Sequence, residues 1–158
     1  LGACGINVAH ELGHRPNRFE QFIAQLLLLP SWYMHFFIQH NRGHHKNVAT
    51  DLDPASAKFN ESLYQFWIRS VSQSYLHAWK LENIRLRKLN SPIWSMKNQM
   101  IQYTCIQGLY LLKITRVSQN WHSTIAIIMS EIIGCLLLFT IAYVNHYHLR
   151  RNRLPTGR

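Results

Sequence analysis

The sequence predicts a mainly α-helical membrane protein. Residues 122–145 form an almost unbroken apolar run in which Glu131 is the one charged residue. As a helix this run would be about 36 Å long, enough to span the hydrocarbon core of a bilayer. Residues 19–38 are also strongly apolar, and no stretch alternates apolar and polar residues as a half-exposed strand does.

The other segments are also interpreted as helices. Residues 1–9 resemble the end of an apolar helix, and residues 99–112 are apolar but short. Residues 51–98 are mixed, with amphipathic stretches that we expect to lie on a surface or at the membrane interface. A buried helical core in a soluble protein is the alternative, and the mean hydropathy of −0.14 favours it. However, an apolar run of 20 or more residues is hard to bury in so small a domain.

The positive charge is arranged in a way that favours a membrane protein over a nucleic-acid-binding protein. The net charge is +10, yet the basic residues form no stripe with interleaved aromatic residues, so we expect no nucleic-acid partner. Of the 17 Lys and Arg residues, 13 lie in residues 42–98 and 146–158, outside the long apolar runs. The positive-inside rule then predicts both basic segments on the cytoplasmic side.

Two histidine-rich motifs predict a metal site. The first is HELGH, which contains His10 and His14, and the second is QHNRGHHK, which contains His40, His44 and His45. Residues four apart lie on one face of a helix, so both members of such a pair can reach one ion. Five imidazoles exceed the needs of one tetrahedral zinc site, which indicates two ions. Imidazole ligands suit iron, copper or zinc and do not decide between them.

The two motifs can share a site only if the chain between them folds back. A straight helix from His14 to His40 would hold them about 39 Å apart. We therefore expect residues 15–39 to reverse direction, with Pro30 as the natural break. Such a hairpin dips into the membrane and returns, or lies at its surface.

The motifs resemble a known family. HELGH, QHNRGHHKNVATDLDPASAKFNESLYQFWIRS and AYVNHYHLRRNRLPTGR occur in the order and with the spacing typical of the membrane-bound alkane 1-monooxygenases. The resemblance implies a multi-pass membrane di-iron enzyme with its histidine motifs at the cytoplasmic side. The chain begins with Leu1 and stops in RLPTGR, so we expect residues 1–158 to be a single fragment that lacks N-terminal helices and a third motif, HxxxxHH.

The resemblance also assigns roles to individual residues. The expected iron ligands are His10, His14, His40, His44, His45 and His146. Glu11 and Asp53 are not expected to bind iron. Each is expected to place its carboxylate next to a ligating imidazole and to orient it. The chain departs from the family pattern at Gln39 and Asn145, where Glu is usual, at His148, where Gly is usual, and at Asp51, where Pro is frequent.

The implied reaction is hydroxylation of the terminal methyl group of medium-chain n-alkanes to 1-alkanols with dioxygen. No flavin, nicotinamide or four-cysteine motif is present. By resemblance, electrons come from rubredoxin, which a rubredoxin reductase reduces, in a bacterial inner membrane. The basic segments 42–98 and 146–158, including Arg150, Arg151 and Arg153, could dock an acidic carrier.

Three alternatives remain open. A related membrane di-iron enzyme, either a xylene-type methyl hydroxylase or a fatty-acid desaturase or hydroxylase, would share the motifs. A zinc metalloprotease would use HELGH alone, with Glu11 as general base. A non-catalytic homologue would fit Gln39 and Asn145.

The remaining histidines and several aromatic residues have no assigned role in the site. We interpret the histidines without a motif partner as structural or interfacial, namely His35, His77, His122 and His148. A second group is interpreted as hydrophobic packing, with some members able to line a substrate channel: Trp32, Tyr33, Phe36 and Phe37.

Overall fold

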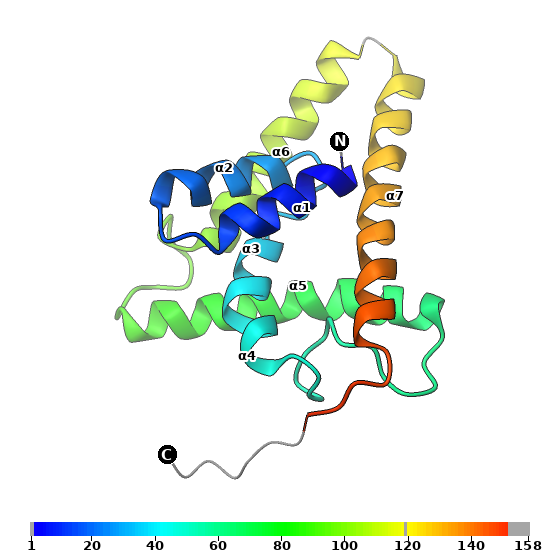
Figure 1. Ribbon diagram of the computed structural model, residues 1–158. Coiled ribbons are helices and arrows are strands. Elements are labelled where there is room, and N and C mark those ends of the chain that lie inside the picture. Colours follow the sequence, from blue (N-terminus) through cyan, green and yellow to red (C-terminus); the bar gives the residue numbers. More distant parts are fainter. Residues whose placement is uncertain (1, 119, 152–158) are drawn as a thin grey trace.

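In the computed structural model the long helix α5 contacts α3, η1, α6 and α7, while α1 and α2 pack against each other (Figure 1). The structure describes residues 2–118 and 120–151, and the described part contains no strand. The elements in chain order are α1 (Gly2–Gly13), α2 (Arg18–Leu28), α3 (Phe36–Gln39), the π-helix η1 (His40–His44), α4 (His45–Asn47), α5 (Leu63–Lys88), α6 (Gln99–Val117) and α7 (Trp121–His146). The mainly α prediction is confirmed.

The helices α1 and α2 form a hairpin, and the chain then turns again before α3. The first turn contains Pro16, and the side chain of Asn17 caps α2 by accepting a 2.9 Å hydrogen bond from the backbone N–H of Phe19. The second turn follows Leu28 and contains Pro30, as the sequence predicted. The expected reversal of residues 15–39 is therefore confirmed, although it uses two breaks where the prediction named one.

Helix α5 supports the segment that carries the second histidine motif. The amphipathic stretches predicted within residues 51–98 form one continuous helix, which begins with a capping box between Ser62 and Gln65. Its buried residues recur every fourth position: Phe66, Ser70, Ser74, Ala78, Glu82 and Leu86. The small side chains in the middle of this row allow α3 and η1 to pack closely across α5.

Helix α7 is the one described helix that is long and apolar enough to cross a membrane. Its best window has a mean hydropathy of 2.4, and only 22% of that window is buried. Helix α6 does not meet the same criteria within the described residues, so crossing the membrane more than once stays a prediction. The C-terminal half of α7 packs on α5, where Phe66 and Phe139 belong to one hydrophobic cluster (Figure 1).

Candidate metal centre

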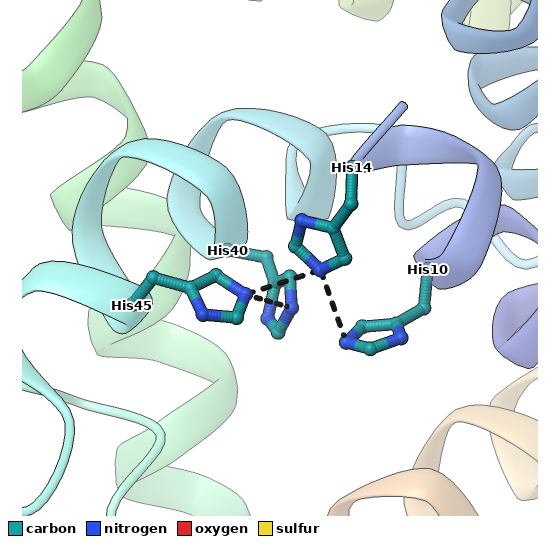
Figure 2. Close-up of side chains that lie close together, drawn as sticks. All are labelled: His10, His14, His40 and His45. Carbon is teal, nitrogen blue, oxygen red and sulfur yellow. Dashed lines mark hydrogen bonds between the residues drawn. The ribbon is translucent and has the colours of Figure 1, made fainter. Parts of the chain in front are cut away.

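Four imidazoles from two separate parts of the chain meet in one cluster (Figure 2). They belong to His10, His14, His40 and His45, and their candidate ligand nitrogens all lie within 4.8 Å of one another. The Nε2 atom of His45 lies 2.9 Å from that of His40 and 3.1 Å from that of His14. The Nε2 atoms of His10 and His14 are 3.3 Å apart. The two motifs therefore converge, as the sequence predicted.

The first motif supplies its pair through ordinary helical spacing. His10 lies in the last turn of α1, and His14 follows the end of that helix, where its backbone N–H donates to the carbonyl of Glu11. The continued turn keeps the two imidazoles on one face. Glu11 itself is largely exposed, and its carboxylate lies 3.9 Å from the guanidinium of Arg15. Within the described residues, Glu11 thus lies beside Arg15 and makes no hydrogen bond to an imidazole of the cluster.

The second motif uses a π-helix, which the sequence analysis did not predict. The backbone N–H of His45 donates to the carbonyl of His40, five residues earlier. A π-helical turn is wider than an α-helical turn, so residues five apart come onto one face. His40 therefore pairs with His45 within the cluster, whereas spacing by four residues predicted a pair of His40 and His44. π-Helical turns of this kind occur frequently at functional sites.

His44 lies beside the four-histidine cluster and is bound to Asp53. Its Nδ1 atom lies 2.7 Å from Oδ2 of Asp53, which also accepts a hydrogen bond from the hydroxyl of Ser56. Burial alone would raise the pKa of Asp53, but hydrogen bonds from His44, Ser56 and the backbone of Ala55 lower it below its usual 3.8. An ionised Asp53 fixes the proton of His44 on Nδ1 and leaves Nε2 free to bind a metal.

His146 joins the site from the far end of the chain. It is the last residue of α7, and its ring centroid lies 5.1 Å from that of His44. The centroids of His40 and His44 are also 5.1 Å apart, so His44 connects His146 to the four-histidine cluster. The six residues assigned by resemblance therefore lie in one continuous group.

The described residues fit a metal because burial favours the neutral imidazole at three of the four clustered histidines, His10, His40 and His45. Burial, and then the neighbouring imidazoles, lower the pKa of His40 from 6.5 to about 2. Burial and His14 also lower the pKa values of His10 and His45. A neutral imidazole keeps a lone pair for a metal ion, and protonated rings this close together would repel one another. A donor set of neutral nitrogens is compatible with iron, copper or zinc.

The other histidines lie outside the four-histidine cluster. His35 is buried between Tyr33 and Tyr75, and His77 packs against Gly43. The remaining two contact single aromatic residues: His122 lies against Trp121, and His148 against Phe59. These positions agree with the structural or interfacial role that the sequence analysis gave them.

A cavity of about 220 Å³ lies beside the imidazoles. Imidazoles of the candidate metal centre form one part of its wall, and the apolar face of α7 around Leu138 and Ala142 forms another. Tyr33 and Phe36 also line it, so these two aromatic residues do more than pack. The α7 residues could not be predicted as part of the cavity, because a uniformly apolar run does not distinguish a cavity-lining face from a lipid-facing one.

The match to a family model decides which group of proteins the chain belongs to. Residues 1–157 match the model described as fatty acid desaturase. The chain belongs to the fatty acid desaturase family. The converging histidine motifs of α1 and of residues 40–45 lie entirely within the matched residues.

Several proteins similar to the chain are alkane 1-monooxygenases. The chain is 36% identical to an alkane 1-monooxygenase of Ectopseudomonas oleovorans, over 100% of this chain and 39% of that protein. It is 36% identical to alkane 1-monooxygenase 2 of Pseudomonas aeruginosa, over 100% of this chain and 42% of that protein. It is 28% identical to the hydroxylase component of a xylene/toluene monooxygenase of Pseudomonas putida, over 96% of this chain and 41% of that protein. The chain thus spans about two fifths of the length of these relatives.

Proposed function

We propose that this chain forms the part of a membrane di-iron monooxygenase that supplies six of its metal ligands. The reaction is hydroxylation of the terminal methyl group of medium-chain n-alkanes, with dioxygen as the oxidant. The single observation that carries the proposal is the convergence of His10, His14, His40 and His45 next to an apolar cavity. The alkane 1-monooxygenase relatives support the choice of substrate.

The proposed metals are two iron ions. His10, His14, His40 and His45 would hold one of them or share both, and His44 and His146 would contribute from the neighbouring positions. Bound iron would supply the activation of dioxygen and the oxidation of an unactivated C–H bond, for which side chains alone are too weak. Asp53 would orient His44 through its Nδ1–H, and burial would keep His40 neutral.

The cavity would position the substrate. An alkane offers no hydrogen bond, so its binding depends on apolar contacts such as those of Leu138, Phe139 and Ala142 on α7. Helix α7 is a candidate membrane span, and alkanes partition into bilayers, so substrate could enter from the lipid phase. The aromatic side chains of Tyr33 and Phe36 would help to exclude water from the methyl group next to the imidazoles.

The electron donor in this proposal is rubredoxin, an acidic carrier that docks on the basic surface next to the histidines. Two basic segments meet there, because the guanidinium of Arg151 donates a 2.7 Å hydrogen bond to the carbonyl of Lys46. Lys46, Lys58 and Arg150 are exposed around this contact. Arg153, which the sequence analysis included in this surface, lies outside the described residues. We place this surface on the cytoplasmic side of a bacterial inner membrane.

Product analysis of the full-length protein tests the proposal. The purified enzyme, supplied with iron, rubredoxin and rubredoxin reductase, should convert n-octane to 1-octanol, and oxygen-18 from labelled dioxygen should appear in the alcohol. A desaturated fatty acid or a hydroxylated xylene as the preferred product would instead support a related di-iron enzyme. Activity that requires zinc and persists without dioxygen would overturn the proposal.

A further inference from the structure

Arg42 lies within the π-helix, but its side chain points away from the histidine cluster into a network of polar contacts on α5. One guanidinium nitrogen donates a 2.9 Å hydrogen bond to Glu82, and another donates a 2.8 Å hydrogen bond to the side-chain oxygen of Gln99. Glu82 is fully buried. We call Arg42, Glu82, Arg85 and Gln99 the Glu82 network.

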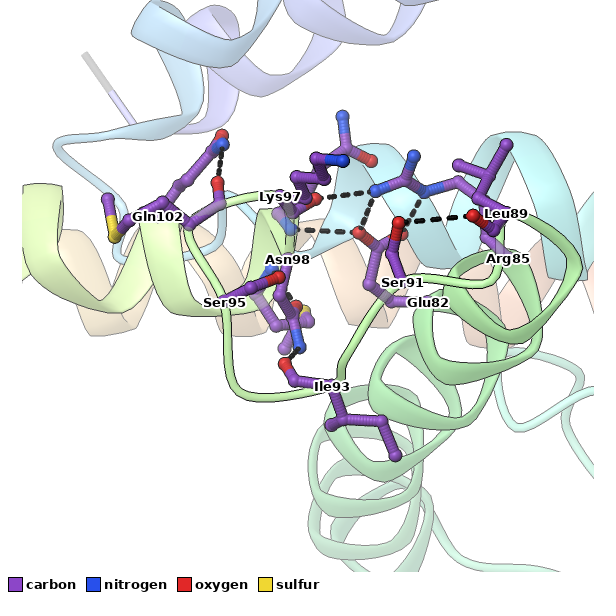
Figure 3. Close-up of polar contacts among 12 residues, drawn as sticks. Glu82, Arg85, Leu89, Ser91, Ile93, Ser95, Lys97, Asn98 and Gln102 are labelled. Carbon is purple, nitrogen blue, oxygen red and sulfur yellow. Dashed lines mark hydrogen bonds and ion pairs between the residues drawn. The ribbon is translucent and has the colours of Figure 1, made fainter.

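The carboxylate of Glu82 accepts hydrogen bonds from Arg42, Arg85 and Gln99. Figure 3 shows the contacts between Arg85 and Glu82. Arg85 donates to both of its oxygens, and the backbone N–H of Gln99, at the start of α6, donates to Oε1 over 2.8 Å. Arg85 also donates to the backbone carbonyl of Lys97. Burying a carboxylate is costly unless it is paired and hydrogen-bonded, so these contacts hold η1, α5 and α6 in one arrangement.

The π-helix is also fixed on its other side by close packing. A Cβ atom added to Gly43 would lie 2.8 Å from Cε1 of His77 and 3.0 Å from Cδ1 of Leu81. A side chain at residue 43 would therefore have to displace the side chains of His77 and Leu81, and glycine avoids this. The π-helical turn thus contacts α5 at two neighbouring residues. Arg42 does so through its side chain, and Gly43 lets its backbone approach α5 closely.

We propose that Glu82, acting through Arg42, is a positioning residue that holds residues 40–45 in the π-helical register. In that register His45 meets His40 and His14. Without the ion pair, the segment is free to adopt the more favourable α-helical register, in which residues four apart, and not five apart, share a face. The cluster would then lose its fourth imidazole. This inference rests on the metal site of the proposed function, but its tests do not depend on catalysis.

Metal titration of the full-length protein provides the first test. Metal-free protein in detergent would be titrated with Co²⁺, and binding would be followed by the visible absorption of the ion. Arg42→Met keeps the aliphatic stem and removes the ion pair, and we expect metal affinity to fall about 10-fold to 100-fold. Arg42→Lys keeps the positive charge beside Glu82 but loses the forked guanidinium that contacts Glu82 and Gln99 through separate nitrogens, so it should restore part of the affinity. The Arg42→Met/Glu82→Gln double variant should bind no more weakly than Arg42→Met alone.

A matched control separates positioning from a general loss of stability. Leu86 is fully buried on α5, one turn after Glu82. Leu86→Ala creates a cavity in the same helix and leaves the Glu82 network in place. We expect Leu86→Ala to unfold at a lower temperature while it keeps the Co²⁺ affinity of the wild type. An equal loss of Co²⁺ affinity in Leu86→Ala and Arg42→Met would overturn the proposal.

Amide hydrogen exchange tests the register without any metal. The N–H of His45 donates across five residues to His40, and this bond exists only in the π-helical turn. We expect faster exchange at His45 in metal-free Arg42→Met than in the wild type or in Leu86→Ala. A wild-type protein that binds no Co²⁺ would refute the proposed function, while exchange would still test the register. Unchanged exchange together with unchanged Co²⁺ affinity in Arg42→Met would refute the positioning role.

Discussion

The Nδ1 atom of His44 lies 2.7 Å from Oδ2 of Asp53, and this contact joins the second histidine motif to the loop that follows it. Asp53 is only 3% exposed, and Ser56 and the backbone of Ala55 complete its hydrogen bonds. Because these hydrogen bonds fix the carboxylate of Asp53, the carboxylate holds the imidazole of His44 in one orientation. Asp53 therefore directs the imidazole of His44 toward those of His146 and His40.

Asp53→Asn should weaken metal binding in the full-length protein. The amide keeps the shape of the carboxylate but loses the charge that favours a proton on Nδ1 of His44. We expect metal affinity to fall about 10-fold to 100-fold, as measured by Co²⁺ titration. Asp51→Asn is the matched control, because Asp51 is exposed two residues earlier and should leave binding unchanged. Equal binding by Asp53→Asn and the wild type would show that His44 needs no such support.

His14→Ala and His44→Ala should each abolish alkane hydroxylation in the full-length enzyme. Each variant removes one imidazole from the proposed ligand set. Iron content and the yield of 1-octanol would be measured for both variants. His122→Ala serves as the control, because His122 contacts Trp121 away from the cluster. An active His44→Ala enzyme with full iron content would show that the ligand assignment is wrong.

The convergence of the first and second motifs could be predicted because ligands of one metal site must lie close together in space. His10 and His14 are four apart, so a shared face followed directly from helical periodicity. Ligands of one site must also come within a few Å of one another, which required the chain to fold back near Pro30. His146 was placed in the group by family resemblance alone, because a single histidine at a helix end carries no spacing signal.

The π-helix and its support could not be predicted in the same way. The choice between α-helical and π-helical register depends on the tertiary contact between Arg42 and Glu82, which are 40 residues apart. In the sequence, Glu82 looks like one more charged residue in an amphipathic helix, and its complete burial comes from the start of α6 packing over it. The part of the cavity wall on α7 could not be predicted either, because Leu138 and Ala142 lie in a run that is apolar on all faces.

The cavity predicts a change in chain-length preference. Ala142 lines the cavity on α7, so Ala142→Phe should fill part of its roughly 220 Å³. We expect lower activity on longer n-alkanes relative to shorter ones, which competition between n-hexane and n-decane would measure. Val144→Phe is the control, because Val144 is on the same helix but 69% exposed. An unchanged preference in Ala142→Phe would mean that substrate does not occupy this cavity.

The buried carboxylate predicts a loss of stability in acid. Burial alone would raise the pKa of Glu82, but hydrogen bonds from Arg85 and the backbone of Gln99 hold it below its usual 4.5. The folded state therefore binds this proton less readily than the unfolded state, and the contribution of Glu82 is fully present above about pH 4.5. It is lost as the pH falls through the lower, folded pKa.

Glu82→Gln should flatten this acid dependence. Unfolding temperatures of the full-length protein would be compared from about pH 6 to about pH 3. Wild type should lose stability more steeply than Glu82→Gln over this range. Some dependence should remain in the variant, because the pKa values of Asp53 and Glu61 are also lowered. Parallel curves for the two proteins would show that Glu82 has the same pKa in both states.

The basic surface predicts a salt-dependent reaction with the electron donor. Lys46 and Arg150 are exposed where the two basic segments meet, so charge reversal there should repel an acidic carrier. We expect Lys46→Glu/Arg150→Glu to slow electron transfer from rubredoxin at low ionic strength and to flatten its dependence on salt. Lys113→Glu is the control, because Lys113 is exposed on α6, outside both basic segments. Equal rates and equal salt dependence in the double variant and the wild type would place the docking surface elsewhere.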